Sequence, residues 1–379
     1  MDTRRRLKIA VAIKNFAITG GAEKYAVEIA TRMVARGHDV HVYAREVDTG
    51  LTHGMTVHRL PYRLRFSSVL SLYAYARQIT QQIQHGDYDI VHSHDRGCAC
   101  DVATIHTFSY LHNLETRSVF KKLNDYYLSP RGRLYGVLER KQMRSRALVA
   151  VSRIVQADIK KYSGRSTGIH VVTPGVDLDA FSPVAVDTQR QADPDGRSYP
   201  SEEGPIRLLF VGSEFRRKGL DALLRELPNN MTLTVVGKGE RRHHYQQLVH
   251  AMGLGQRVIF EGLCDDVRPF YLAAHLLVLP SLREAFGMAA LEAMACGLPV
   301  VVSTAAGVAS IVDNGYNGFV FSHPAELKAI LERLSDPNLR KTIGQNARRT
   351  AMRHTWDRAA EQYEALYWDV YDKKRKGRV

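Results

Sequence analysis

Two carboxylate residues, Glu284 and Glu292, flank the start of a short apolar segment in the second half of the chain. A strand-like run at residues 276–280 precedes them, and Gly297 and Pro299 follow, as at the end of a helix. A strand that passes through a short loop into a helix brings free backbone N–H groups to a sheet edge, where they bind anions. The stretch therefore indicates either a site for an anionic, hydroxyl-rich ligand or a surface helix whose dipole favours nearby acidic residues.

The spacing of these two carboxylates suggests the size of such a ligand. If a continuous helix joined Glu284 to Glu292, about 12 Å of helix axis would separate them. That length is similar to the reach of a nucleotide sugar from its sugar to its ribose. Carboxylates suit hydroxyl-rich ligands because each accepts two or more hydrogen bonds.

The elements that would position these residues follow one pattern in both halves of the chain. Buried strand-like runs alternate with amphipathic helical runs, which predicts two doubly wound α/β domains that face each other across a cleft. Polar residues 184–205 contain almost no core side chains and read as a linker. The expected organisation is a first domain at 1–183, the linker at 184–205, a second domain at 206–355, and a final helix and basic tail at 356–379 that packs back on the first domain.

The first half contains further candidate residues. Gly20 and Gly21 open a helix after the first strand and would let a phosphate or sugar approach the backbone, although such a pair more often marks only a tight turn. His92 and His94 would lie on one side of a strand and Asp95 on the other. The two histidines therefore lack a third ligand at a suitable spacing, and no metal is expected. His106 follows a strand directly and would lie at the ligand-binding edge of a parallel sheet.

The charge of the chain indicates acidic partners. Its formal net charge is +14 and its pI is about 9.6. The basic residues gather in four places: Arg63 with Arg65, Lys121 with Lys122, Arg131 to Arg146, and Lys373 to Lys376. Tyr62, Phe66, Leu70, Leu72 and Tyr73 lie among them, a mixture suited to an anionic membrane face or simply to a solvated surface. Nucleic acid is not expected, because the sequence lacks zinc-finger spacing, an RNP-type aromatic run and a separable basic helix.

Cysteines and apolar runs indicate the compartment. The four cysteines are scattered, which argues against a disulfide framework and favours a reducing cytoplasm. The apolar run at residues 9–13 is too short for a signal peptide, and no run reaches the ~20 residues of a membrane span. We expect a cytoplasmic protein, peripheral on the inner face of the membrane, and the sequence carries no signal for its oligomeric state.

Taken together, the motifs resemble one enzyme family. Over almost its whole length the chain is similar to the retaining glycosyltransferases of family 4, which have the GT-B fold, and within them to enzymes of lipopolysaccharide core and cell-surface glycans. The motifs that carry the resemblance are Gly20-Gly21-Ala22-Glu23, Arg36 to Val40, His106-Thr107, Val151-Ser152, Pro174 to Asp177, Phe181-Ser182-Pro183, Lys218-Gly219, Gly237 to Glu240, and Glu284 to Val301.

The resemblance implies roles for particular residues. The donor would be a nucleotide diphosphate sugar, most often UDP-linked and bound mainly by the second domain, and no metal or cofactor would be needed. Where the family pattern has an arginine directly after a glycine, this chain has Ser213, so either Arg216 or Arg217 would take its place. The expected site residues are Glu284 and His106 at the reacting sugar, Arg216 or Arg217 with Lys218, Gly20 and Gly21 at the diphosphate, Phe286, Gly287 and Met288 at the donor sugar, and Glu292 at the ribose.

The reaction implied is front-face transfer of a hexose to a glycolipid or phosphorylated glycan acceptor that contacts the first domain. Three alternatives stay open: a GT-B nucleotide-sugar epimerase, a phosphorylase, and a non-catalytic nucleotide-sugar-binding subunit. A dinucleotide-linked dehydrogenase fits less well, because neither half contains a complete G-x-G-x-x-G motif with a downstream acid.

Overall fold

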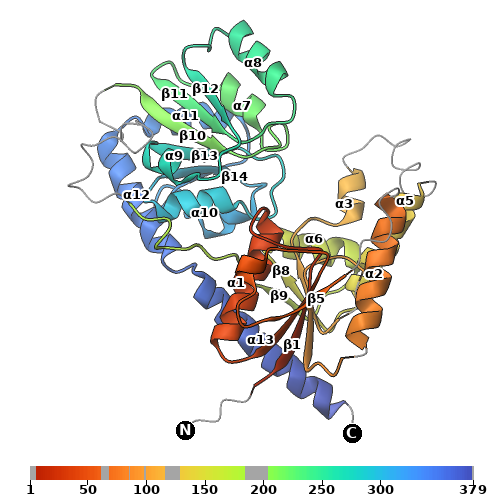
Figure 1. The fold of residues 1–379 in the computed structure, drawn as a ribbon. Helices are drawn as coiled ribbons and strands as arrows, with labels where there is room; N and C mark the ends of the chain where they lie inside the picture. The colour runs from red at the N-terminus through yellow and green to blue at the C-terminus, as the bar shows by residue number, and fades with distance from the viewer. Residues whose placement is uncertain are drawn as a thin grey trace. The chain divides into compact units, whose positions relative to one another are not determined.

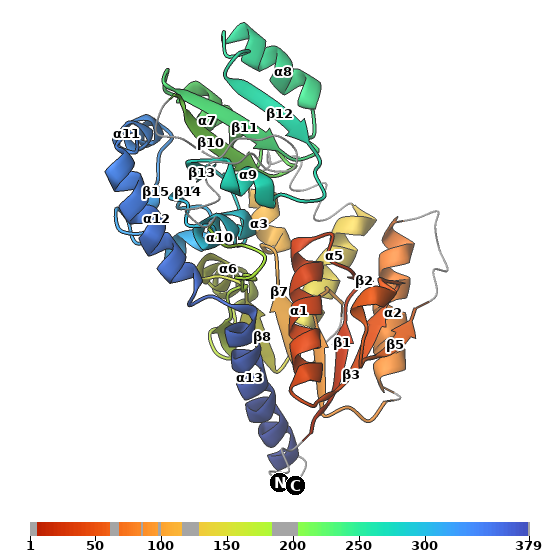
Figure 2. The same ribbon diagram turned by 60° about the vertical axis from the view of Figure 1, so that its left-hand side comes forward.

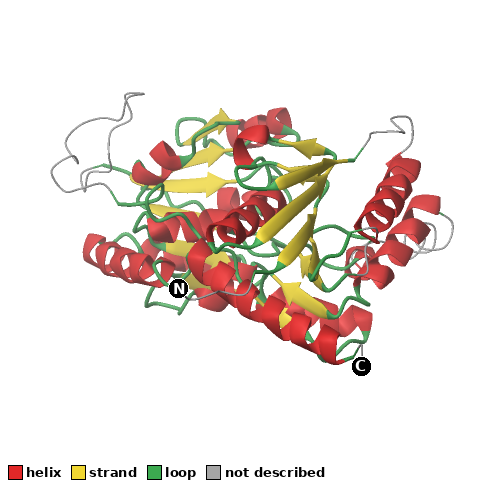
Figure 3. Cartoon of the chain, turned by 60° about the horizontal axis from the view of Figure 1, so that its bottom comes forward, coloured by secondary structure: helices red, strands yellow, loops and turns green. Residues whose placement is uncertain are grey.

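The chain folds into two compact units, each built around a parallel sheet (Figures 1–3). The structure, a computed structural model, describes residues 6–60, 68–84, 86–97, 100–115, 129–183 and 204–377. The first unit spans Met1–Pro174 and Trp356–Val379, and the second spans Gly175–Thr355. The candidate basic and aromatic residues Tyr62, Arg63, Arg65, Phe66, Lys121 and Lys122, and the linker residues 184–203, lie outside the described residues.

The sheet of the first unit has seven strands in the order β5-β3-β1-β6-β7-β8-β9. The elements of this unit are β1 (Lys8–Ala12), β2 (Asn15–Phe16), α1 (Gly21–Ala35), β3 (Asp39–Ala44), β4 (Glu46–Val47), the 3₁₀ turn η1 (Thr49–Leu51), β5 (Thr56–Arg59), α2 (Ser68–Gln84), β6 (Ile90–Ser93), β7 (Val102–Ile105), α3 (Tyr110–Glu115), α5 (Pro130–Gln142), β8 (Ala147–Ala150), α6 (Arg153–Ser163), β9 (Ile169–Val171) and α13 (Trp356–Lys376).

Helices cover both faces of this sheet. Helices α1 and α13 lie together on one face, and α2 and α5 lie together on the other (Figures 1 and 2). Strands covered on both faces need near-continuous apolar runs, and all four residues of β8 are accordingly buried. Ser152 caps α6, because its hydroxyl accepts a hydrogen bond from the N–H of Val155 at 3.3 Å.

The last helix returns to the first unit, as the sequence predicts. Lys374 of α13 donates to the carbonyl of Asp89 and to the carboxylate of Asp101, both at 3.0 Å. Arg36, the C-cap residue of α1, pairs with Glu364 of α13 at 2.8 Å. Because Lys374 is engaged in this way, part of the basic tail anchors the helix and is not free for a partner.

The boundary between the units differs from the one expected at residue 183. Segment 175–183 belongs to the second unit, because the N–H of Val176 donates to the carbonyl of His354 at 2.9 Å and Arg348 donates to the carbonyl of Phe181 at 2.7 Å. The sequence placed the boundary at a change in composition, whereas these hydrogen bonds join segments far apart along the chain.

The sheet of the second unit has six strands in the order β12-β11-β10-β13-β14-β15. The elements are β10 (Ile206–Val211), α7 (Leu220–Arg225), β11 (Met231–Val236), α8 (Arg242–Ala251), β12 (Val258–Gly262), α9 (Arg268–Leu272), β13 (Leu276–Leu279), α10 (Met288–Ala295), β14 (Val300–Ser303), the 3₁₀ turn η4 (Gly307–Ile311), β15 (Phe319–Phe321), α11 (Ala325–Arg333) and α12 (Pro337–Ala351).

Strand order locates the candidate binding edge in each unit. From β10 the chain builds the sheet outward through β11 and β12, then returns to place β13 on the other side of β10. The same reversal separates β1 from β6 in the first unit. Ligands of open α/β sheets bind at the carboxyl ends of the strands beside such a reversal. A ligand is therefore expected at the loops after β10 and β13 in the second unit, and at those after β1 and β6 in the first.

Candidate active site

A compact charged cluster lies at the reversal in the second unit. The carboxylate of Glu284 contacts the Nζ atom of Lys218 at 2.7 Å and the Nη1 atom of Arg217 at 3.3 Å. The side chains of Glu284 and Lys218 are each 14% exposed, so the pair is largely shielded from water. Lys218 and Arg217 come from the loop after β10, and Glu284 comes from the loop after β13. The fold thus unites two of the motifs that the sequence singled out separately.

The backbone holds these two loops together. Gly219 has φ +77°, and a Cβ atom there would lie 1.8 Å from the carbonyl oxygen of Pro280, so only glycine allows this approach. The N–H of Leu282 donates to the carbonyl of Arg217 at 2.9 Å, and the N–H of Glu284 donates to that of Ala305 at 3.0 Å. The backbone that carries the Glu284 side chain is therefore hydrogen-bonded to the loop after β10 on one side and to Ala305 on the other.

The geometry distinguishes Arg217 from Arg216. Arg217 faces Glu284, contacts Glu214 and donates to the carbonyl of Arg283 at 2.6 Å. Burial opposes the charge of Arg217, but the carboxylates of Glu284 and Glu214 outweigh it and raise its pKa. Arg216 is exposed, and its charge acts instead on Tyr245 of α8. Of the two arginines, Arg217 is the one beside Lys218 and Glu284.

Helix α10 begins at Met288, four residues after Glu284, so the two carboxylates are not joined by a continuous helix. The estimate of about 12 Å between them, which used the helical rise, therefore does not apply. Gly287 precedes the helix with φ +106°, a conformation that glycine adopts readily. Phe286 is one of the expected sugar-binding residues, but its side chain is buried. It can therefore offer a ligand only its backbone.

Glu292 lies in the second turn of α10 and has a partner that the sequence did not indicate. The hydroxyl of Tyr271, which is fully buried in α9, donates to the Oε2 atom of Glu292 at 2.8 Å. Burial and then the charge of Glu292 raise the pKa of Tyr271, and the same two causes raise that of Cys296 to about 12. Both groups therefore stay protonated, and Tyr271 fixes the orientation of the carboxylate. No periodicity or spacing could have revealed this contact.

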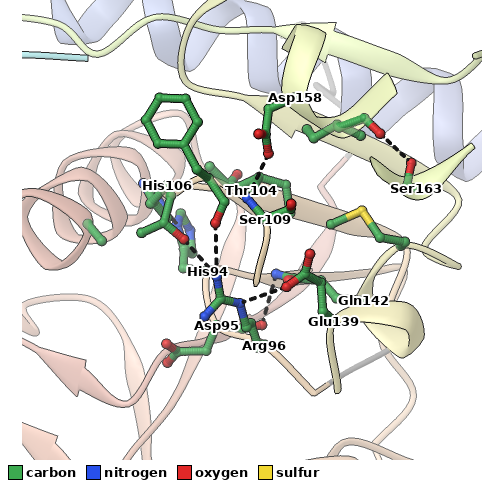
Figure 4. Close-up of a pocket in the computed structure, with 16 residues that line it drawn as sticks. His94, Asp95, Arg96, Thr104, His106, Ser109, Glu139, Gln142, Asp158 and Ser163 are labelled. Atoms are coloured by element: carbon green, nitrogen blue, oxygen red, sulfur yellow. Dashed lines mark hydrogen bonds and ion pairs between the residues drawn. The ribbon is translucent and has the colours of Figure 1, made fainter. Parts of the chain in front are cut away.

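His106 lines a cavity of about 170 Å³ in the first unit (Figure 4). The cavity lies at the carboxyl ends of β6 and β7 and is closed by residues of α5 and α6. His106 follows β7 directly, as the sequence suggested, and its Nε2 atom lies 3.0 Å from the Nδ1 atom of His94. Burial lowers the pKa of His106 to about 3, so its ring is neutral near pH 7.

Carboxylates and one arginine form the polar wall of this cavity. Arg96 donates to the hydroxyl of Thr107 at 3.0 Å and lies 3.7 Å from Glu139. Asp158 accepts a hydrogen bond from the N–H of Ser109 at 2.7 Å (Figure 4). Burial raises the pKa of Glu139, although the charge of Arg96 opposes the shift. The wall thus offers both donors and acceptors to a hydroxyl-bearing ligand.

His92 in β6 and His94 just after it do not form a metal centre with Asp95. His92 uses both ring nitrogens within the core, at 2.7 Å from the hydroxyl of Thr104 and 2.7 Å from that of Tyr367. Asp95 accepts hydrogen bonds from the N–H of Lys14 and, at 3.1 Å, from the hydroxyl of Tyr75. Within the described ranges, no group of three or more His, Cys, Asp or Glu side chains is arranged to hold a metal ion.

The paired glycines after β1 open a helix as expected. Helix α1 begins at Gly21, and Gly20 occupies the N-cap, so no side-chain hydrogen bond caps the N–H groups of the first turn. Both glycines belong to the first unit, whereas Lys218 and Arg217 belong to the second. Their shared role at a diphosphate is a prediction.

Comparison with known proteins identifies the family. Residues 193–350 match the glycosyl transferases group 1 family, and residues 19–180 match glycosyltransferase family 4. A D-inositol 3-phosphate glycosyltransferase of Xylanimonas cellulosilytica is 30% identical over 402 residues, which cover 95% of this chain and 93% of that protein. The chain therefore belongs to the family 4 glycosyltransferases, and the two units are the two domains of the GT-B fold.

Two solved structures are similar over nearly the whole chain. WaaG, a glycosyltransferase involved in lipopolysaccharide biosynthesis, superposes with a TM-score of 0.78 at 25% identity, covering 94% of this chain and 98% of WaaG. Anabaena Alr3699/HepE in complex with UDP and glucose has a TM-score of 0.71 at 21% identity, covering 96% and 100%. The second likeness concerns the fold alone. The family models and the relative from Xylanimonas make this protein a glycosyltransferase.

Part of the membrane expectation can be examined in the structure. In the described part of the chain, no helix is both long and apolar enough to cross a bilayer. Helices α2 and α5, which lie side by side in Figures 1 and 2, carry the exposed apolar side chains Leu70, Tyr73 and Val137. Arg131 and Arg133 of α5 are exposed as well. Leu70, Tyr73 and the basic residues of 131–146 are among those that the sequence indicated for an anionic membrane face.

Proposed function

We propose that the protein is a retaining, metal-independent glycosyltransferase that transfers a hexose from a UDP-hexose to a phosphorylated, hydroxyl-rich acceptor. The observation that carries the proposal is the contact of Glu284 with Lys218 and Arg217 at the strand reversal of the second unit. Two cations beside one carboxylate, all partly shielded from water, suit a ligand whose anionic and hydroxyl-bearing parts are adjacent.

The two cations would bind the diphosphate. When the bond between the sugar and the diphosphate breaks, negative charge grows on the leaving oxygen, and fixed cations stabilise it. Lys218 and Arg217 would supply this stabilisation, together with the N–H groups at the start of α10 and, from the first unit, those at Gly20 and Gly21. Of the two arginines that the sequence left open, Arg216 is the less suitable, because it is exposed and its charge acts on Tyr245 of α8.

Glu284 would hold hydroxyls of the donor sugar and favour positive charge at its anomeric carbon. In the front-face reaction, the acceptor oxygen bonds to the anomeric carbon as the bond to the phosphate oxygen breaks. The acceptor proton passes to that phosphate oxygen, so no protein carboxylate needs to become a covalent intermediate. His106 would contact the sugar from the first unit, and Glu292, oriented by Tyr271, would bind the ribose hydroxyls.

The relatives favour a phosphorylated acceptor. The name D-inositol 3-phosphate glycosyltransferase denotes a phosphorylated, hydroxyl-rich substrate for those proteins, and WaaG acts in lipopolysaccharide biosynthesis. A glycolipid acceptor would place the enzyme on the cytoplasmic face of a membrane, with the apolar and basic surface of α2 and α5 against anionic lipid. A small phosphorylated cyclitol would need no membrane.

A transfer assay tests both parts of the proposal. The full chain is incubated with radiolabelled UDP-glucose, UDP-galactose or UDP-N-acetylglucosamine. The acceptor is D-inositol 3-phosphate in solution or a lipopolysaccharide-core acceptor in vesicles with and without anionic lipid. Transfer with retained anomeric configuration in the presence of EDTA is the expected result. Inverted product or a requirement for divalent metal would refute the mechanism.

The alternatives give different products in the same assay. An epimerase would return an isomerised UDP-sugar without acceptor, and a phosphorylase would form sugar 1-phosphate from a glycan and phosphate. A non-catalytic subunit would bind UDP yet show neither transfer nor slow hydrolysis of the donor. Glu284, Lys218 and Glu292 all stand in contacts suited to catalysis, which favours the transferase over the binding subunit.

A further inference from the structure

His106 has a buried histidine partner. The Nδ1 atom of His94 lies 3.0 Å from the Nε2 atom of His106, and the two rings stack with centroids 5.2 Å apart at 21°. His94 is only 6% exposed. Both side chains line the cavity of the first unit and lie next to each other in Figure 4. Because this contact uses the Nε2 atom of His106, its Nδ1 atom is the ring nitrogen left for a ligand.

The protonation of this pair follows from what surrounds His94. Burial and then the neighbouring His92 and His106 lower its pKa well below 6.5, so His94 is neutral. One nitrogen of each ring therefore carries a proton, and only one proton lies between the rings. The Nε2 atom of His94 is buried and has no hydrogen-bond partner among the described residues.

A neighbouring chain of hydrogen bonds explains why no hydroxyl serves that atom. The hydroxyl of Tyr25 lies 3.0 Å from the carbonyl of Val172 and 3.2 Å from the hydroxyl of Tyr363, and it is the donor toward both. The hydroxyl of Tyr363 lies 2.6 Å from that of Thr104. Thr104 and Tyr367 each lie 2.7 Å from a ring nitrogen of His92, so these hydroxyls are engaged with one another and with His92, and none contacts the Nε2 atom of His94.

The position of the shared proton can now be assigned. If His106 donated its proton, His94 would carry a buried N–H without an acceptor. If His94 donates instead, its Nε2 atom is a buried acceptor without a donor. Among buried backbone groups, orphaned N–H donors are rarer than under-satisfied acceptors, and we apply the same preference to the ring nitrogens of His94. The favoured arrangement has the Nδ1–H of His94 donating to the Nε2 atom of His106.

We propose that His94 is a positioning residue that holds the proton of His106 on Nδ1, so that His106 presents an N–H donor to the bound sugar. The inference rests on the proposed function in one respect, the contact of His106 with the donor sugar. With its free nitrogen protonated, His106 binds a hydroxyl oxygen and cannot accept the proton of the attacking acceptor. Proton transfer to the leaving phosphate oxygen is the consequence.

Nuclear magnetic resonance tests the proton position without any substrate. The full chain is labelled with ¹⁵N-histidine, and the His106 signals are identified by their loss in His106→Gln. Long-range ¹H–¹⁵N couplings should show the Nδ1–H form of His106 in the wild type. In His94→Leu, which has no donor, the Nε2–H form should appear. An Nε2–H form of His106 in the wild type would overturn the assignment.

Kinetics test the positioning role, with UDP-glucose hydrolysis or transfer as the probe. His94→Asn keeps an N–H near the place of Nδ1 and should retain kcat within about threefold, whereas His94→Leu should lower it by about tenfold, the value of one hydrogen bond. The KM for UDP-glucose should change less than kcat in both variants. Equal loss of kcat in Asn and Leu variants of equal thermal stability would contradict the proposal.

A matched control separates positioning from general destabilisation. His41 and His58 form a similar pair at the β3–β5 end of the sheet, with Nδ1 of His41 2.9 Å from Nε2 of His58. His58→Leu removes that bond away from the cavity and should leave kcat unchanged. If the control loses as much kcat as His94→Leu, the effect is structural and the positioning role is wrong. If the wild type turns over no UDP-hexose, the proposed donor fails, and the resonance experiment still decides the proton position.

Discussion

Replacing Glu284 by glutamine separates two roles that the charged cluster combines. Glutamine keeps the size of the side chain and removes the negative charge that Lys218 contacts at 2.7 Å and Arg217 at 3.3 Å. In the free enzyme this charge competes with the diphosphate for the same cations. In the reaction, by our proposal, it stabilises the positive charge that develops at the sugar. Binding and turnover should therefore respond in opposite directions.

The distances set the size of both effects. At an effective dielectric of about 20, opposite charges 2.7 Å apart attract by about 6 kcal/mol, most of which is offset by desolvation. A charge-assisted hydrogen bond retains about 1.5–3 kcal/mol net. Release of the cations in Glu284→Gln should leave UDP affinity unchanged or raise it by up to about tenfold. Turnover should fall by about 100-fold or more, as for other groups that stabilise developing charge.

Calorimetric titration with UDP and the radiolabelled transfer assay measure the two quantities on the same preparation. Lys218→Met is the complementary variant and should weaken UDP binding by about 10- to 100-fold and lower turnover with it. Glu214→Gln is the matched control, because Glu214 contacts Arg217 from the exposed side of the same loop. It should leave turnover near that of the wild type.

Two results would refute this reasoning. If Glu284→Gln keeps normal turnover, Glu284 does not act at the reacting sugar. If it weakens UDP binding as much as Lys218→Met does, the carboxylate orders the cations for the diphosphate and does not compete with it. In the double variant, UDP affinity should resemble that of Lys218→Met alone.

Further predictions concern the other contacts. Arg217→Ala should weaken UDP binding by about tenfold while Arg216→Ala does not, and equal effects in calorimetry would contradict the assignment. Glu292→Gln should weaken binding of UDP by about tenfold but that of 2′,3′-dideoxy-UDP little, so an equal loss for both nucleotides would exclude a ribose contact. Stability should fall as the pH is lowered from 6.5 toward 3, by about 1 kcal/mol per pH unit for each buried histidine, because the unfolded state binds the protons that the folded state excludes. The histidines concerned are His92, His94 and His106, whose pKa values are lowered by burial. Urea unfolding between pH 7.5 and pH 5 measures how the free energy of unfolding changes with pH. A free energy of unfolding that does not change over this range would contradict the prediction.

Periodicity was sufficient to predict the alternation of strands and helices, because strands covered on both faces need continuous apolar runs. Strand β8 is an example, because all four of its residues are buried. Helix α12 was not anticipated, since its pattern mixes buried and polar residues: Arg340 and Asn346 are buried beside its apolar face. Its register is set by packing against α10, which sequence spacing does not encode.

The sequence by itself determined which residue types stand at the ends of strands: Lys218 after one, Glu284 after another and His106 after a third. Only the tertiary structure decided which of them meet. Strand order brings Arg217 and Lys218 to Glu284, and a buried hydroxyl from α9 orients Glu292. It also places His94 against His106 in the other unit. Local spacing sets where a side chain leaves the backbone, whereas partners distant along the chain are chosen by the register and order of the strands.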